Sequence, residues 1–314
     1  MNAESSPRPI LAVVGPTASG KSGLAIELAM QLDGEIINCD SVQVYQGIQI
    51  ATAKVPLAER HGVPHHLIDF VPPHVNYTAG DWAREAVARI TEIEGRGRLP
   101  ILAGGTGLYL RALRRPFFSS PPTDERLRRR LTAIRKRHGA EHLHRLLQRL
   151  DPASAKELYA RDWPRVHRAL EVRLQTGLSM SAQKDHRPEP PENVRRIRVL
   201  ALNPDREQLY KIINERTENH FAAGLVNEVQ DLLAQGVPPE SNALGAHSYR
   251  RTVEYLLGRR DLASAVEQSK LDVRHYAKRQ LTWFRHEVGV EWFPGFGTES
   301  AVREVVLNAV TRSA

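Results

Sequence analysis

The octapeptide G-P-T-A-S-G-K-S at residues 15–22 constrains the fold more than any other stretch of the chain. It matches the phosphate-binding pattern G-x-x-x-x-G-K-[S/T], and it lies between an apolar run at residues 10–14 and a helical pattern. The glycines let successive backbone N–H groups point at a diphosphate, and the following helix adds its positive end. We expect Lys21 to reach the outer phosphate and the Ser22 hydroxyl to hold Mg²⁺. The predicted diphosphate-binding residues are Gly15, Pro16, Thr17, Ala18, Ser19, Gly20, Lys21 and Ser22.

The hydrophobic pattern around this loop predicts an α/β fold, with a P-loop NTPase-like core in which helices flank a parallel sheet. We expect strands at residues 10–14, 36–37, 65–69, 101–103, 196–202 and 290–293. After the loop, apolar residues recur at helical spacing as far as Leu32, and Gly34 is expected to end that helix. In a sheet of this kind ligands bind beyond the carboxyl ends of the strands.

Two further turns follow predicted strands and are expected at the same edge of the sheet. Asp40 comes just after the short strand at 36–37, and we expect its carboxylate in the crevice beside the phosphate loop. Its alternative role is to cap the next short helix. The second turn, residues 104–107, reads G-G-T-G, which suits a ligand held close to backbone, although a tight packing turn between strand and helix has the same composition.

The middle of the chain has a different character. Arginine-rich helices are predicted at residues 124–138, 140–150 and 163–176, and no strand signal interrupts them. Strand material resumes afterwards, so we expect a helical insertion at 113–193 within a core formed by 8–112 and 194–314. The net charge of +8 favours a polyanionic partner, for which tRNA, DNA and an acidic membrane all qualify, while solvated arginines on helix faces are the alternative.

Cysteine content and the apolar runs bear on the cellular compartment. A single cysteine, Cys39, excludes an internal disulfide or a thiolate zinc site. Residues 1–9 lack the apolar core of a signal peptide, and no apolar run approaches the ~18 residues of a membrane span. We therefore expect a soluble, monomeric protein in the cytoplasm that does not bind a membrane.

Four segments in this order resemble the bacterial tRNA dimethylallyltransferases: G-P-T-A-S-G-K-S, C-D-S-V-Q-V-Y, G-G-T-G-L-Y-L and A-K-R-Q-L-T-W-F-R. The likeness extends from about residue 10 to residue 293. It implies that the diphosphate is the leaving group of dimethylallyl diphosphate and not part of a nucleotide. It also implies that the acceptor is the exocyclic N6 amine of the adenosine on the 3′ side of the anticodon in tRNA.

The residues fit this chemistry. An adenine amine is a weak nucleophile, so the reaction depends on departure of the diphosphate, whose growing charge the loop amides, Lys21 and Mg²⁺ at Ser22 would stabilise. Asp40 can accept the proton of the amine. The resemblance places Thr106 near the leaving oxygen and Arg216 as a charge clamp on the diphosphate. The predicted catalytic residues are thus Asp40, Thr106, Lys21 and Arg216.

The resemblance also implies a set of tRNA contacts around a flipped-out target base. These are Asp40, Ser41, Val42, Gln43 and Thr106 at the base, Arg128, Pro164, Arg165, Val166, His167 and Arg168 in the insertion, and Lys278, Arg279, Gln280 and Arg285 along the RNA backbone. Trp283 and Phe284 favour core packing. The chain departs from the family pattern at Ser248, where a glycine is usual.

Three other functions share some of these features. A nucleotide kinase would have the same loop and sheet and would use ATP, although no apolar strand ends in the aspartate typical of ATPases. A P-loop RNA-binding regulator would have no need of a general base at Asp40. A transferase acting on free adenine nucleotides would not need the basic insertion.

Overall fold

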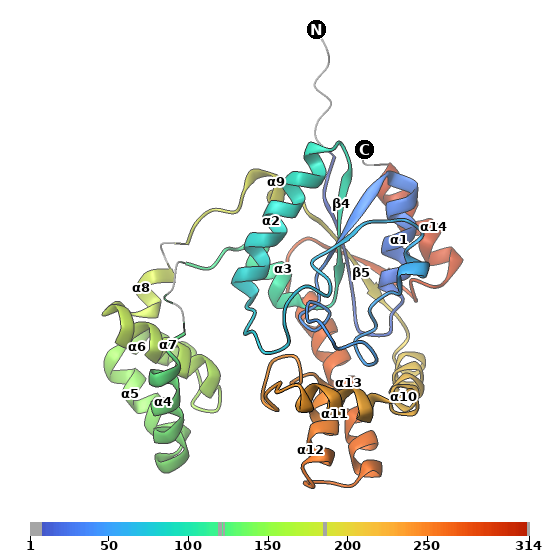
Figure 1. The fold of residues 1–314 in the computed structure, drawn as a ribbon. Coiled ribbons are helices and arrows are strands. Elements are labelled where there is room, and N and C mark those ends of the chain that lie inside the picture. The colour runs from blue at the N-terminus through green and yellow to red at the C-terminus, as the bar shows by residue number, and fades with distance from the viewer. Residues whose placement is uncertain (1–7, 119–120, 122, 185–186, 313–314) are drawn as a thin grey trace. The chain divides into compact units, whose positions relative to one another are not determined.

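The computed structural model describes residues 8–118, 121, 123–184 and 187–312. The chain forms two compact units (Figure 1). Unit 1 comprises Met1–Arg114 and Pro191–Ala314, and unit 2 comprises Arg115–Pro190. The two segments of unit 1 share one sheet, because strands from both pair with the same central strand.

Unit 1 is built on a six-stranded sheet in which every pair of neighbours is parallel. The strand order is β3-β2-β4-β1-β5-β6. Parallel pairing brings the carboxyl ends of all the strands to one edge, and the order reverses direction at β1, where ligands bind in open α/β sheets. The strands are β1 (Leu11–Val14), β2 (Gly34–Asn38), β3 (His65–His66), β4 (Leu99–Gly104), β5 (Arg198–Asn203) and β6 (Val290–Pro294).

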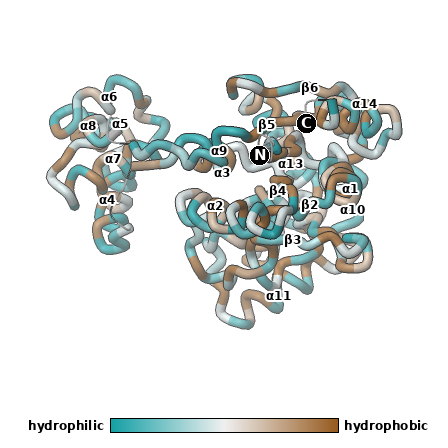
Figure 2. The backbone as a smooth tube through the Cα atoms, turned by 90° about the horizontal axis from the view of Figure 1, so that it is seen from above, coloured by the Kyte–Doolittle hydropathy of each residue, from teal (hydrophilic) through white to brown (hydrophobic). Residues whose placement is uncertain are grey.

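Helices cover both faces of the sheet. Leu11 and Val13 of β1 share one apolar cluster with α1 (Lys21–Leu32) and α14 (Ser300–Thr311). The alternate residue of β1, Ala12, belongs to the opposite cluster with α2 (Ala79–Gly95) and α3 (Gly107–Arg114). Figure 2 shows β4 and β5 mostly in the hydrophobic colour, as expected for strands buried on both faces.

Besides α14, the described part of the second segment of unit 1 contains four longer helices and one short one. A left-handed Gly224, with φ of 96°, separates α10 from α11. The helices are α9 (Glu192–Arg195), α10 (Arg206–Ala222), α11 (Leu225–Ala234), α12 (His247–Leu256) and α13 (Leu262–Arg285), and a 3₁₀ turn, η1 (Leu57–Arg60), lies in the first segment.

Unit 2 is helical throughout its described residues and has a core of its own. Leu131, Leu143, Leu147 and Leu170 are fully buried in it. Aspartates cap two of its helices, because Asp124 and Asp151 accept hydrogen bonds from the backbone of the first turn. The helices are α4 (Glu125–His138), α5 (Ala140–Leu150), α6 (Pro152–Glu157), α7 (Trp163–Thr176) and α8 (Met180–Lys184).

Two local expectations need correction. The strand expected at 65–69 ends after His66, because Leu67 and Asp69 have φ of 56° and 58°, a left-handed conformation that cannot continue a strand. The helix that follows the phosphate loop ends at Asp33, with φ of 51°, and not at Gly34. Gly34 instead opens β2, where a side chain would meet Ile101 and the carbonyl of Leu99 at 2.9 and 3.0 Å.

Candidate active site

The phosphate-binding loop lies between the end of β1 and the start of α1. Gly20, with φ of 80°, precedes the helix, and the Lys21 ammonium turns back to the carbonyl of Pro16 at 3.3 Å. The Ser19 hydroxyl is buried, and no described residue forms a hydrogen bond with it. A buried hydroxyl without a partner is costly, so it points to a polar ligand in the loop.

Two cations at this edge of the sheet, Lys21 and Arg216, form no ion pair with a described residue. Burial lowers the pKa of Lys21 to about 8, with attraction to Asp40 opposing and repulsion by Arg216 adding to the shift. Burial also lowers the pKa of Arg216. Among the described residues, no carboxylate oxygen lies within 4.0 Å of either charged group. Ion pairs elsewhere in the protein meet this limit. Two partly buried cations without an acid between them favour an anionic ligand.

Asp40 follows β2 and caps a turn at residues 41–44, whereas the alternative left open by the sequence was the cap of a short helix. Its Oδ1 accepts the backbone N–H groups of Val42 at 2.9 Å and Gln43 at 3.3 Å. No described residue donates to its other oxygen, Oδ2, and the residue lines the cavity described below. One carboxylate oxygen thus holds the loop while the other remains available to a ligand.

The turn after β4 lies against the loop that carries Asp40. The Thr106 hydroxyl accepts the backbone N–H of Ser41 at 3.0 Å, and the Thr106 N–H donates to the carbonyl of Cys39 at 3.1 Å. The glycines permit this approach: a Cβ at Gly104 would overlap the backbone of Cys39, and one at Gly107 would overlap the Trp283 ring. The G-G-T-G turn therefore packs tightly, and its Thr106 lines the cavity described below.

Gln280 lies in the interior and not along an exposed face of α13, which corrects the expectation of an RNA backbone contact. Its side chain is 4 % exposed. Its oxygen accepts the N–H of Thr17 at 2.8 Å, and its amide donates to the carbonyl of Gly105 at 2.9 Å. Gln280 therefore joins the phosphate loop to the turn after β4.

A cavity of about 510 Å³ opens at this edge of the sheet in unit 1. It brings together seven of the predicted site residues: Thr17, Ala18, Asp40, Ser41, Val42, Thr106 and Arg216. Lys21 and Gln43 are not in its wall. The amide of Gln43 instead donates to the carbonyls of Thr52 and Ala53 at 2.9 and 3.2 Å.

The cavity also contains aromatic residues that the sequence did not single out as site residues. Tyr276 lies within hydrogen-bonding reach of Thr106, and burial raises its pKa so that the phenol stays protonated. No signal in the sequence marked it, because Tyr276 shares its face of α13 with Gln280, four residues on, whose burial was not expected. The other aromatic and imidazole side chains of the wall are Tyr45, Tyr77, Tyr109, His220, His247 and Tyr249.

The outer face of α13 carries exposed cations. Lys278, Arg279 and Arg285 are exposed. The first two border a second hollow, of about 580 Å³, whose other lining residues are Arg111, His275, Thr282, Trp283 and His286. Phe284 is buried in the core of unit 1, as expected, whereas Trp283 is partly buried under the guanidinium of Arg111, 3.9 Å from its ring centre.

Some of the residues of unit 2 that were predicted to contact RNA are exposed, and others are buried. Pro164 and Arg165 are exposed at the start of α7. Val166 and His167 are buried in the helical unit, so their side chains cannot contact RNA in this conformation, which corrects that expectation. Arg128 pairs with the buried Glu171 at 2.7 Å, and Arg168 also reaches Glu171. Consecutive helical residues face different directions, so only part of the 164–168 segment is on the surface.

The described residues contain neither a cluster of metal-binding side chains nor a membrane-spanning helix. No group of three or more histidine, cysteine, aspartate or glutamate side chains could hold a metal ion there. In the same ranges no helix is long and apolar enough to span a bilayer.

The parallel sheet, the glycine loop after its central strand and the adjoining cavity define an α/β protein of the P-loop class. Residues 43–287 match the family model for IPP transferase. The chain belongs to that family, which favours a transferase over the nucleotide kinase considered above.

Named relatives and solved structures agree with this assignment. The chain is 45 % identical to tRNA dimethylallyltransferases of Solibacter usitatus and Geobacter metallireducens, with 97 % and 91 % of this chain and 98 % and 93 % of each relative covered. The crystal structure of the tRNA isopentenylpyrophosphate transferase of Bacillus halodurans is similar, with a TM-score of 0.72, 36 % identity, and 98 % of this chain and 96 % of that chain covered. A eukaryotic dimethylallyltransferase acting on tRNA gives a TM-score of 0.79 at 26 % identity, over 98 % of this chain and 80 % of its own.

Proposed function

We propose that this protein is a tRNA dimethylallyltransferase. It transfers the dimethylallyl group of dimethylallyl diphosphate to the N6 amine of the adenosine on the 3′ side of the anticodon and releases diphosphate. The observation that carries the proposal is the pair of partly buried cations, Lys21 and Arg216, which lack a carboxylate partner and lie at the same sheet edge as Asp40. The named relatives support the same reaction.

The charges at the site suit a reaction in which a diphosphate leaves. The bond between the allylic carbon and the diphosphate oxygen breaks, and its electron pair stays on the diphosphate. The loop amides, Lys21, Arg216 and the Thr106 hydroxyl would stabilise that charge. The adenine nitrogen forms the new bond to the allylic carbon, and its proton passes to the free Oδ2 of Asp40.

Magnesium fits the donor set at the phosphate loop. Mg²⁺ retains several waters and takes substrate phosphate oxygens together with one or two protein oxygens. Ser22 is the first serine of α1, it is partly buried, and no described residue forms a hydrogen bond with its hydroxyl. We propose that this hydroxyl holds the ion, which would neutralise charge on the diphosphate when bound.

The RNA partner in this proposal is the anticodon stem-loop. A base must leave its stack to reach a cavity of this kind, and aromatic walls stabilise a flipped base. The exposed Lys278, Arg279 and Arg285 on α13, together with Pro164 and Arg165 of unit 2, would bind the RNA backbone. We expect a monomeric enzyme of the cytoplasm.

The proposal is tested by incubating the purified chain with labelled dimethylallyl diphosphate and an anticodon stem-loop that carries consecutive adenosines. We expect label in the RNA, and none in a matched stem-loop with guanosine after the anticodon. Label that stays out of the RNA contradicts the proposed function. Equal transfer to free AMP contradicts the choice of tRNA as acceptor.

A further inference from the structure

One wall of the cavity is a stretch with almost no regular secondary structure. Residues 41–54 form turns and extended stretches, with one isolated β-bridge between Tyr45 and Val71 that is not part of the six-stranded sheet. A segment without a helix or strand depends on side chains for its shape. Six of its residues line the cavity: Ser41, Val42, Tyr45, Ala51, Thr52 and Ala53.

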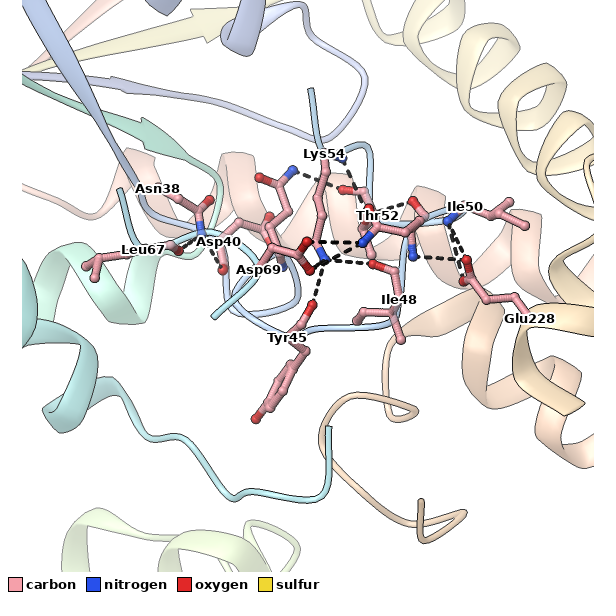
Figure 3. Close-up of polar contacts among 12 residues, drawn as sticks. Asn38, Asp40, Tyr45, Ile48, Ile50, Thr52, Lys54, Leu67, Asp69 and Glu228 are labelled. Atoms are coloured by element: carbon pink, nitrogen blue, oxygen red, sulfur yellow. Dashed lines mark hydrogen bonds and ion pairs between the residues drawn. The ribbon is translucent and has the colours of Figure 1, made fainter. Parts of the chain in front are cut away.

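Lys54 holds two carbonyls of this segment, and a carboxylate from outside it, around one ammonium group, as Figure 3 shows. Its Nζ donates to the carbonyl of Tyr45 at 2.6 Å, to the carbonyl of Ile48 at 2.7 Å and to Asp69 at 2.6 Å. An ammonium has three N–H donors, so each donor is used. The side chain is only 5 % exposed. A buried donor with all its bonds satisfied fixes the backbone that it touches.

A second anchor fastens the same segment to the C-terminal helices of unit 1. Glu228 of α11 accepts the N–H groups of Gln49 and Ile50 at 3.0 and 3.1 Å (Figure 3). The hydroxyl of Tyr249 donates to Glu228 at 2.5 Å and accepts the N–H of Ala51 at 3.2 Å. Residues 49–51 are therefore held from one side while Lys54 holds residues 45 and 48 from the other.

These anchors lead back to Asp40. The N–H groups of Val42 and Gln43 donate to Asp40 Oδ1. The amide of Gln43 in turn donates to the carbonyls of Thr52 and Ala53, next to Lys54 in the chain. The start and end of the segment are thus tied together, and a shift of its backbone would move the donors that orient the Asp40 carboxylate.

We propose that Lys54 is a positioning residue for the transfer reaction: through the backbone of residues 43–53 it holds Asp40 and the adjoining cavity wall in place. Lys54 does not line the cavity, and none of its hydrogen bonds reaches the phosphate loop. It therefore acts on the acceptor side of the reaction and not on diphosphate binding. The inference rests on the proposed function.

The test uses the full chain with Lys54→Met, which keeps most of the side-chain length and removes the three donors. The readout is the single-turnover rate constant with enzyme in saturating excess, because an unfolded fraction of enzyme does not lower that constant. We expect it to fall roughly 10-fold to 100-fold, the scale of a misplacement of about 1 Å. The KM for dimethylallyl diphosphate should stay within about two-fold of the wild-type value, since the phosphate loop is outside this network.

Lys270→Met is the matched control. Lys270 is also a largely buried lysine of unit 1, with its side chain 12 % exposed, and it pairs with Glu218 and Glu267 at 2.5 and 2.6 Å, outside the cavity wall. We expect the wild-type rate constant from this control. An unchanged rate constant in Lys54→Met, or an equal loss in Lys270→Met, overturns the inference.

A second variant covers the case in which Lys54→Met does not fold. Asp69→Ala removes the acidic partner of Lys54 and leaves its bonds to the carbonyls of Tyr45 and Ile48, so it disturbs the segment less than Lys54→Met does. We expect a smaller loss in the same rate constant, and an unchanged value overturns the inference. Failure of the proposed function is distinguishable, because then the wild-type protein itself transfers no label to RNA.

Discussion

The side-chain oxygen of Gln280 accepts the backbone N–H of Thr17 at 2.8 Å, across 263 residues of sequence. The amide of the same side chain donates to the carbonyl of Gly105. One residue of α13 thus fixes the spacing between the phosphate loop and the turn that carries Thr106. A single buried amide therefore holds the loop and the turn that we propose to contact the leaving diphosphate.

Gln280→Leu should therefore damage both stability and diphosphate binding. It leaves the N–H of Thr17 and the carbonyl of Gly105 without a partner, at a cost of about 1–3 kcal/mol in the free energy of unfolding. We expect a lower melting temperature and a raised KM for dimethylallyl diphosphate. Gln268→Leu, which removes a bond to Asp272 on the same helix, is the control. A wild-type KM in Gln280→Leu would show that the hydrogen bonds of Gln280 do not determine the conformation of the phosphate loop.

Asp40 caps the turn that follows it and is also the proposed general base. Two variants distinguish these two roles. Asp40→Asn keeps an oxygen that can accept the N–H groups of Val42 and Gln43, whereas Asp40→Ala removes it. We expect both to lower the chemical rate by roughly 10²-fold or more. Only Asp40→Ala should lose about 0.5–2 kcal/mol of stability. RNA affinity, measured by filter binding, should change little, and normal turnover by either variant would remove Asp40 from the mechanism.

Lys21 should make diphosphate binding depend on pH. Because burial lowers the pKa of Lys21 to about 8 in the free protein, the ammonium is present below that pH and is lost above it. We expect the affinity for inorganic pyrophosphate, measured by calorimetry, to be steady up to about pH 8. Above it the affinity should fall toward about ten-fold per pH unit. Lys21→Met should bind more weakly without this decline, and a wild-type affinity that is level to pH 9 would contradict the assignment.

The backbone of Cys39 lies so close to Gly104 that we expect this position to tolerate no side chain. A Cβ there would overlap the carbonyl of Cys39, which is backbone and cannot move aside. Gly104→Ala should cost several kcal/mol and prevent folding or lower the melting temperature sharply. Gly95→Ala is the control, since nothing lies within 4 Å of a Cβ at that position near the end of α2. Equal melting temperatures for the two variants would rule out the clash.

Two histidines of the cavity wall should reduce stability in mild acid. Burial lowers the pKa of both His220 and His247 to about 4, with nearby arginines adding to the shift. The unfolded chain therefore binds protons between about pH 6.5 and pH 4 that the folded chain does not, and stability falls as the pH falls through this range. The loss at pH 5 should be roughly 1 kcal/mol per histidine, as both are partly exposed. The double variant His220→Asn/His247→Asn should show a smaller difference in melting temperature between pH 7 and pH 5.

Most of the helices and strands could be predicted because their signals are local. The apolar run before the phosphate loop became β1, and α7 has the predicted bounds of Trp163–Thr176. Helix caps such as Asp124 and Asp151 can be predicted from sequence, because each aspartate accepts from backbone N–H groups two or three residues later. The strand at His65 was overextended because its end depends on a left-handed turn at Leu67, which no local rule requires of a leucine.

Candidate site residues could be proposed from the sequence where they belong to a recognisable motif, as Lys21, Asp40 and Thr106 do. It was not predictable where a residue acts through a distant partner. Gln280 and Lys54 are polar residues near the ends of recognisable segments, and a polar side chain on a helix or loop is usually solvated. Their burial and hydrogen bonds appear only when segments far apart in sequence meet.

The sequence by itself determined the α/β class, the phosphate loop and the family resemblance, because these depend on neighbouring residues and on periodicity. The tertiary structure alone decided the strand order β3-β2-β4-β1-β5-β6 and the meeting of Arg216 with the loop after β1. It also decided which polar residues face the cavity and which hold its wall. These are long-range contacts, whose free energy arises only when the chain has closed and water has been excluded from the groups that pair.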